Sequence, residues 1–191
     1  MGYVDDAAGA VQAAGGLDAV SRAASGGTQP FDRDGARAAR GRVDLAFLAE
    51  LNGHPYLRQP LPKTTGRELF GKDFVYPLLA RFEQRLDDLQ ATVTRFTAEA
   101  ITRSYRELLP APPEEVYVSG GGSQNRTLMA HLAELLAPIP VTTTADLGVD
   151  PNAKEALLFA VLANETLHGR AGNVPGVTGA AGFRVLGKIT L

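Results

Sequence analysis

The strongest chemical signal in the sequence is a run of three glycines, Gly120, Gly121 and Gly122. A short apolar stretch precedes it and a helical pattern follows it. Consecutive glycines are entropically costly unless the backbone needs positive φ or close approach to another group. Backbone N–H groups at the start of a helix attract anions, and a flat nucleotide could pack where no β-carbon stands. Asn125 could then hydrogen-bond to a sugar or base edge, so the pattern predicts a nucleotide-binding loop.

A structural interpretation of the same residues stays open. The glycines could simply form a tight turn from strand to helix, with Ser123 as the cap of that helix. The segment is not a P-loop, because no Gly-Lys-Ser/Thr follows, and it is not a GxGxxG motif either. The pattern alone does not decide between nucleotide binding and a plain turn.

Glu155 is the second candidate, in the first turns of a helix that Asp150 and Pro151 open as N-cap and first helical residue. A carboxylate near a helix N-terminus is stabilised by the helix dipole. A solvated Glu155 that stabilises its own helix is therefore the simpler interpretation. A pocket at this helix end would be needed to make Glu155 a substrate ligand.

Lys63 lies beside two threonines and a glycine, and it could contact a phosphate or a sugar. The same residues also fit a helix entry, with Thr65 as N-cap and Glu68 as its capping-box partner. The helix entry is the favoured interpretation.

The three histidines are not spaced as metal ligands, and we predict no metal site. They are His54, His131 and His168. Of these, His168 stands near a helix end and suits a partner of the C-terminal dipole.

The elements that must position these residues are helices first, then strand, helix, strand and helix, which is an α/β arrangement. Three prolines, at 55, 60 and 62, exclude a continuous helix through the intervening loop. Helices are expected over 18–25, 43–51, two stretches within 73–109, 124–136 and 150–168, and strands over 115–118, 139–143 and 184–189.

Composition narrows the function classes. The chain has 191 residues, 45% of them apolar, which suits one sizeable domain. A formal net charge of -2 gives no general attraction to nucleic acid or to an anionic membrane. The absence of cysteine excludes disulfides and thiolate metal sites. No apolar run reaches membrane-spanning length, and residues 1–6 lack the basic region of a secretory signal. We therefore expect a cytoplasmic protein.

Four segments together resemble the anhydro-N-acetylmuramic acid kinase family, in the family's order and with similar gaps. The resemblance extends over about residues 18–191. The segments are PYLRQPLPKTTGRELF, VYVSGGGSQNRTLMAHL, VTTTADLGVDPNAKEALLFAVLA and GNVPGVTGAAGFRVLG.

The resemblance implies the actin-like, sugar-kinase and Hsp70 ATPase fold, of which this chain would be the carboxy-terminal lobe with added helices. It implies ATP and Mg²⁺ as cofactors. It also implies a reaction in cell-wall recycling that opens the anhydro ring of anhydro-N-acetylmuramic acid with water and phosphorylates the freed 6-hydroxyl, giving N-acetylmuramic acid 6-phosphate. Carried over, Gly120, Gly121, Gly122 and Asn125 become nucleotide contacts. Glu155 becomes a substrate-binding residue, which reverses the simpler interpretation above. The family also implies a homodimer.

Two departures from the family matter. Its first lobe carries a phosphate-binding Gly-Thr-Ser-x-Asp-Gly loop, and this sequence does not contain that lobe. Leu17-Asp18-Ala19 fits the family, whereas residues 9–15 do not fit the Asp-Thr-Gly-Pro-x-Asn stretch expected before it. The general-base aspartate is therefore unmatched and the catalytic residues stay unassigned, since neither Asp5 nor Asp6 falls in register.

Two hypotheses follow. In the first, residues 18–191 are the nucleotide-binding second lobe of the kinase, and residues 1–17 are a divergent or non-native leader. The chain alone is then inactive because it lacks the first lobe, which a separate polypeptide could supply in trans. In the second, the chain is a non-catalytic module that binds nucleotide or dimerises. Either way, we expect exposed apolar surface that favours association.

Overall fold

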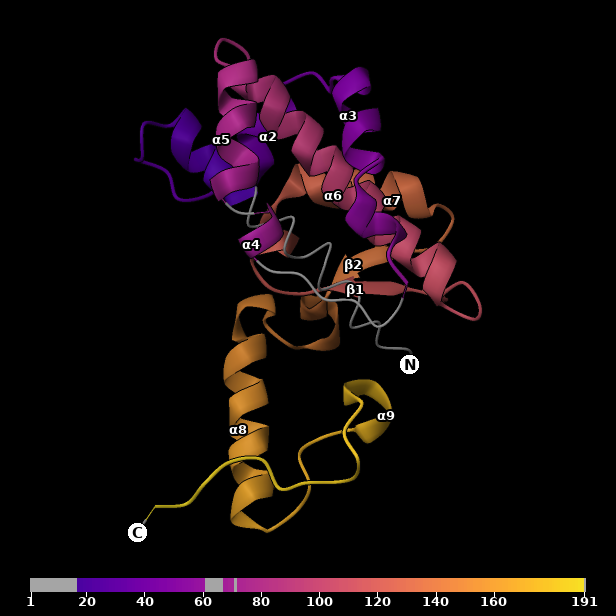
Figure 1. Cartoon of the computed structure of the whole chain (residues 1–191). Helices are drawn as coiled ribbons and strands as arrows, with labels where there is room; N and C mark the ends of the chain where they lie inside the picture. Colours follow the sequence, from indigo (N-terminus) through magenta and orange to yellow (C-terminus); the bar gives the residue numbers. More distant parts are fainter. Residues whose placement is uncertain (1–16, 61–66, 71, 191) are drawn as a thin grey trace.

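The computed structural model describes residues 17–60, 67–70 and 72–190. A helix over residues 17–24 comes first, and the main body contains the other early helices and a small sheet (Figure 1). The helices are α2 (Ala36–Arg40), α3 (Leu45–Asn52), α4 (Arg67–Phe70), α5 (Lys72–Arg81), α6 (Leu86–Leu108), α7 (Arg126–Leu136), α8 (Lys154–Leu167) and α9 (Pro175–Thr178). The strands are β1 (Val116–Val118) and β2 (Val141–Thr143), and the 3₁₀ turns are η1 (Arg33–Gly35), η2 (Pro55–Arg58), η3 (Gly121–Gln124), η4 (Thr144–Leu147) and η5 (Pro151–Ala153).

The long helix α6 is the centre of the fold, because it contributes to both hydrophobic clusters of the described chain. Its residues Leu89, Val93 and Phe96 join a cluster with the helix over 17–24, α3 and α5. On its other side, Ala98 joins Leu128 of α7 and further apolar residues. The second cluster contains Ala98, Leu128 and Leu132, with Ile101, Val118, Met129, Leu135 and Val141 packed against it.

The two strands pair in parallel, with Val116 opposite Val141 and Val118 opposite Thr143. Helix α7 connects them, and its apolar stripe is buried because i, i+4 and i+8 share one helix face. That stripe is Leu128, Leu132 and Leu136. The described chain is thus a mixed helical protein with a small parallel sheet, and the predicted α/β order is confirmed.

Several local predictions are confirmed. The first helix ends before Gly26 and Gly27, whose φ values of 63° and 87° lie in the left-handed region. Helix α3 forms where helical spacing was expected, and the Asp44 carboxylate caps it by accepting from the N–H of Phe47 at 3.0 Å. The predictions for Lys63, Thr65, Asp5 and Asp6 lie outside the described residues, as does the side chain of Glu68.

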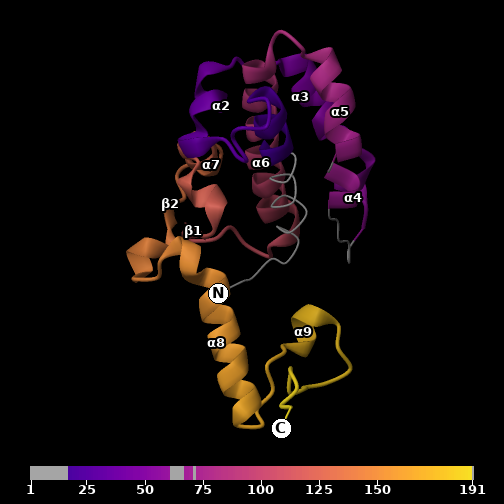
Figure 2. The same ribbon diagram turned by 90° about the vertical axis from the view of Figure 1, so that its left-hand side faces the viewer.

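Helix α8 and the segment after it extend away from the main body (Figures 1 and 2). No residue of α8 is buried, and Phe159 is 69% exposed. The strand expected over residues 184–189 is wrong: the segment is irregular, and the backbone N–H of Gly172 donates to the Arg184 carbonyl without a ladder following it. Strand-forming residues need a neighbouring strand to pair with. No described helix is long and apolar enough to cross a membrane.

Candidate functional site

The glycine loop begins at Gly120, whose φ of 81° requires glycine in practice. The Ser123 hydroxyl donates to the carbonyl of Gly120 at 2.7 Å, and the backbone N–H of Ser123 donates to the same oxygen at 3.1 Å. A β-carbon built on Gly120 or Gly121 would have no atom within 4 Å, and one on Gly122 would meet only Leu128 at 3.6 Å. The loop therefore presents an open backbone surface that a flat ligand could cover.

Asn125 caps helix α7 and thereby ends the loop. Its Oδ1 accepts from the backbone N–H of Leu128 at 3.0 Å. The idea that Ser123 caps this helix is therefore wrong, because α7 starts at Arg126 and only Asn125 stands immediately before it in an extended conformation. Among the described residues, the Asn125 Nδ2 has no hydrogen-bond partner, so this amide nitrogen is the group available to a ligand.

The structure brings the glycine loop to the start of α8. The backbone N–H of Gly120 donates to the carbonyl of Pro151 at 2.8 Å, and the Gln124 side-chain amide donates to Asn152 Oδ1 at 2.8 Å. Asp150 caps the turn as predicted, since its carboxylate accepts from the N–H of Asn152 at 2.8 Å. Two motifs recognised separately in the sequence are thus neighbours.

Glu155 lies in the first turn of α8 and is exposed. Helix α8 follows directly on η5, which contacts η3 of the glycine loop. Glu155 is therefore two residues beyond a turn that packs against the loop.

Two residues of this region were missed in the sequence. Gln124 links the loop to Asn152, and the hydroxyl of Thr144, directly after β2, is buried without a partner among the described residues. Ligands of parallel sheets bind at the carboxyl ends of the strands. The signal available for both was their position in the segments that follow β1 and β2.

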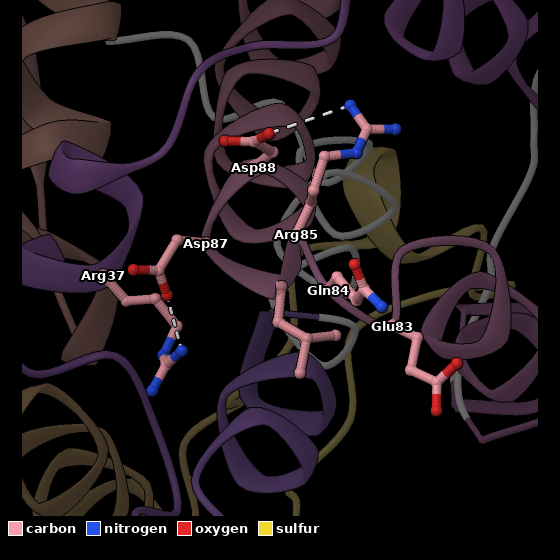
Figure 3. A pocket seen from close by; sticks show the side chains of 7 residues that line it. Arg37, Glu83, Gln84, Arg85, Asp87 and Asp88 are labelled. Atoms are coloured by element: carbon pink, nitrogen blue, oxygen red, sulfur yellow. Dashed lines mark hydrogen bonds and ion pairs between the residues drawn. The ribbon is translucent and has the colours of Figure 1, made fainter.

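One cavity lies away from the glycine loop. It is an open pocket of about 350 Å³ between α2 and the start of α6 (Figure 3). Arg37 pairs with Asp87 at 2.5 Å, and Arg85 approaches Asp88 at 3.8 Å. The charged side chains that line the cavity are therefore largely paired with one another. The cavity is lined by Arg37, Glu83, Gln84, Arg85, Leu86, Asp87 and Asp88. It contains no residue of the glycine loop, and we give it a structural role.

A second charged cluster links α7 to α6. Arg95 donates to Glu99 at 3.0 Å and to Glu134 at 2.7 Å, and it also contacts His131. Burial, followed by the nearby Arg95 charge, lowers the pKa of His131, and the hydrogen bond from Arg95 lowers the pKa of Glu134. No group of three or more His, Cys, Asp or Glu residues in the described part of the chain could hold a metal ion.

The fold and the loop define a class: an α/β protein with an open glycine loop at the carboxyl end of a parallel strand. Comparison with known sequences narrows the class, because the profile of anhydro-N-acetylmuramic acid kinase matches residues 12–191. The chain belongs to the anhydro-N-acetylmuramic acid kinase family, as its four motif segments indicated.

Individual relatives agree with the profile. An anhydro-N-acetylmuramic acid kinase of Thiobacillus denitrificans is 48% identical over 165 residues, which are 83% of this chain and 43% of the relative. One from Cyanothece is 43% identical over 176 residues, covering 91% of this chain and 46% of the relative. One from Caldanaerobacter subterraneus is 41% identical over 180 residues, covering 92% and 46%. The chain spans less than half the length of these curated relatives.

Proposed function

We propose that residues 18–191 form the nucleotide-binding second lobe of an anhydro-N-acetylmuramic acid kinase, with the actin-like, sugar-kinase and Hsp70 ATPase fold. The observation that carries this proposal is the open glycine loop at the carboxyl end of β1, hydrogen-bonded through Gly120 to the start of α8. Gly120, Gly121 and Gly122 would seat the adenosine of ATP, and Asn125 would donate to it through Nδ2.

In the proposed reaction, water adds to the anhydro carbon and breaks its bond to O6, and the γ-phosphate of ATP is transferred to the hydroxyl so freed, giving N-acetylmuramic acid 6-phosphate and ADP. The open backbone surface at the three glycines supports ATP as the ligand of the loop. Glu155 would bind the sugar as a hydrogen-bond acceptor. No group of three or more His, Asp or Glu side chains among the described residues could hold Mg²⁺, and no ligand of the ion is assigned.

Catalysis also needs a clamp for the transferring phosphate and a general base for the attacking water. Neither is assigned to a described residue. We propose that the part of the relatives beyond this chain's match supplies both, either joined to this chain or separate from it. The apolar face of α8 would then dock on that part, since Leu157, Leu158 and Phe159 are all at least half exposed.

The same exposed face supports a second candidate, a non-catalytic module that binds nucleotide or forms a homodimer. Apolar patches on soluble proteins mark interaction sites. A second copy of the chain could cover α8 as well as a first lobe could, without any phosphate transfer.

The nucleotide site is tested by Gly121→Val, with ADP and ATP affinity measured by calorimetry. A β-carbon here meets no protein atom, so the variant should fold, while its branched side chain occupies the place of the purine and abolishes binding. Gly176→Val is the control, because a β-carbon there is equally unobstructed and lies outside the loop. Unchanged affinity in Gly121→Val refutes the nucleotide seat.

The catalytic proposal is tested by phosphorylation of anhydro-N-acetylmuramic acid. The 191-residue chain is assayed alone and together with the amino-terminal half of the Thiobacillus denitrificans relative. Activity only in the mixture supports an incomplete enzyme, and activity of the chain alone overturns that view. Nucleotide binding without activity in either case favours the non-catalytic module.

A further inference from the structure

We propose that Gly35 and Thr127 form a latch that positions Asn125, and through Asn125 the glycine loop, for nucleotide binding. The inference rests on the proposed function, since it adds positioning residues to the same nucleotide site. Neither residue stands in the loop, and Gly35 is far from it in sequence.

The latch consists of a hydrogen bond and a close contact. The Thr127 hydroxyl donates to the carbonyl oxygen of Gly35 at 2.8 Å, although the two residues are 92 positions apart. Gly35 is buried, with a φ of 70°. A β-carbon on it would lie 2.8 Å from Thr127 Oγ1 and 2.9 Å from Thr127 N, and it would overlap Asn125 Oδ1. Only glycine permits this approach.

The turn that presents Gly35 is held in an unusual conformation. Asp34 has a φ of 56°, a positive value that residues other than glycine rarely adopt. The Asp32 carboxylate closes the turn by accepting from the N–H groups of Arg37 at 2.8 Å and Ala38 at 2.9 Å. Backbone strain persists where surrounding contacts enforce it, and it clusters at functional sites. The turn is therefore a rigid support for the residues that it touches.

Asn125 transmits the position of this support to the loop. Its backbone N–H donates to the carbonyl of Gly122 at 3.1 Å, while its Oδ1 caps α7 through Leu128. Displacement of Asn125 by a side chain at position 35 would shift the last glycine and turn the free Nδ2 away. The latch thus controls both kinds of proposed nucleotide contact, the bare backbone and the amide.

The decisive experiment compares Gly35→Ala with Gly26→Ala in the full chain. Both glycines have similar φ values, 70° and 63°, but a β-carbon on Gly26 meets no atom within 4 Å. The two variants therefore share the backbone strain and differ in the contact with Asn125. We expect Gly35→Ala to weaken ADP binding by about 10- to 100-fold, the effect of a small misplacement, and Gly26→Ala to leave it unchanged.

A second pair of variants keeps the test valid if Gly35→Ala does not fold. Thr127→Val removes the hydroxyl, whereas Thr127→Ser keeps it, so only Thr127→Val should weaken ADP binding. Backbone amide chemical shifts of Gly120, Gly121 and Gly122, measured without nucleotide, report the loop directly. They should move in Gly35→Ala and Thr127→Val, and not in Gly26→Ala or Thr127→Ser.

The outcomes separate the two claims. If the wild-type chain binds no ADP, the proposed function fails, and the amide shifts still decide whether the latch positions the loop. If ADP binds, but Gly35→Ala and Thr127→Val match their controls in affinity and shifts, the latch is refuted.

Discussion

The backbone N–H of Gly120 donates to the carbonyl oxygen of Pro151 at 2.8 Å. This bond joins the glycine loop after β1 to the turn that starts α8. Glu155 follows Pro151 within one helical turn, so the candidate nucleotide loop and the candidate sugar ligand share a support.

Asn125 should show two separable roles. Asn125→Asp keeps a side-chain oxygen to cap α7 but lacks the amide donor, so nucleotide affinity should fall while stability is retained. Asn125→Ala should lose both the affinity and about 1 kcal/mol of the free energy of unfolding, the usual effect of a lost N-cap. Urea denaturation and calorimetry measure the two properties. Full affinity in Asn125→Asp would show that Asn125 acts only as a cap.

Glu155→Gln should impair sugar phosphorylation without changing nucleotide affinity. Loss of a charged hydrogen-bond acceptor for the sugar should reduce kcat/KM by about 10- to 100-fold. The assay uses the chain combined with the amino-terminal half of the relative. Glu165→Gln is the matched control, because Glu165 is on the same helix and pairs with Arg170 at 2.6 Å. Equal effects of the two substitutions would contradict a substrate role for Glu155.

The chain should lose stability in mild acid through His54. Its ring packs on Phe70 with centroids 5.3 Å apart, and burial lowers its pKa below the usual 6.5. Below that pH the unfolded chain takes up a proton that the folded chain resists, so the free energy of unfolding falls until the folded pKa is reached.

His54→Asn should flatten this pH dependence. Asparagine can replace the His54 Nδ1 that accepts from the N–H of Tyr56, but it does not titrate. Urea unfolding at about pH 7.5 and about pH 5.5 measures the slope. The variant should be less stable overall, since it loses ring packing, yet it should change less between the two pH values. An unchanged slope would assign the acid sensitivity to other groups.

A substitution in the core and one on α8 should differ sharply in their effect on the free energy of unfolding. Leu132→Ala removes a side chain that is 1% exposed, and it should cost about 2–5 kcal/mol of stability. Phe159→Lys alters a side chain that is 69% exposed, so stability should change by less than about 0.5 kcal/mol. The same substitution should reduce association in sedimentation, because it places a charge on the apolar face of α8. A wild-type chain that is already a monodisperse monomer would contradict the expected association.

The sequence by itself determined the features that depend on neighbouring residues. Gly26 and Gly27 end the first helix, Asp150 and Pro151 open the turn before α8, and the order of strand, glycines and helix around Gly120 is realised as predicted. Each depends on φ preference, capping or periodicity within a few positions. The four motif segments were likewise sufficient to indicate the family.

Tertiary structure alone decided what depends on residues distant in the chain. It set Gly35 against Thr127 and Gly120 against Pro151. Within the described part of the chain, it also left residues 184–189 without a partner strand and α8 without a buried residue. Local preferences cannot choose among such contacts, because their free energy comes from the packing and hydrogen bonding of segments that only folding brings together.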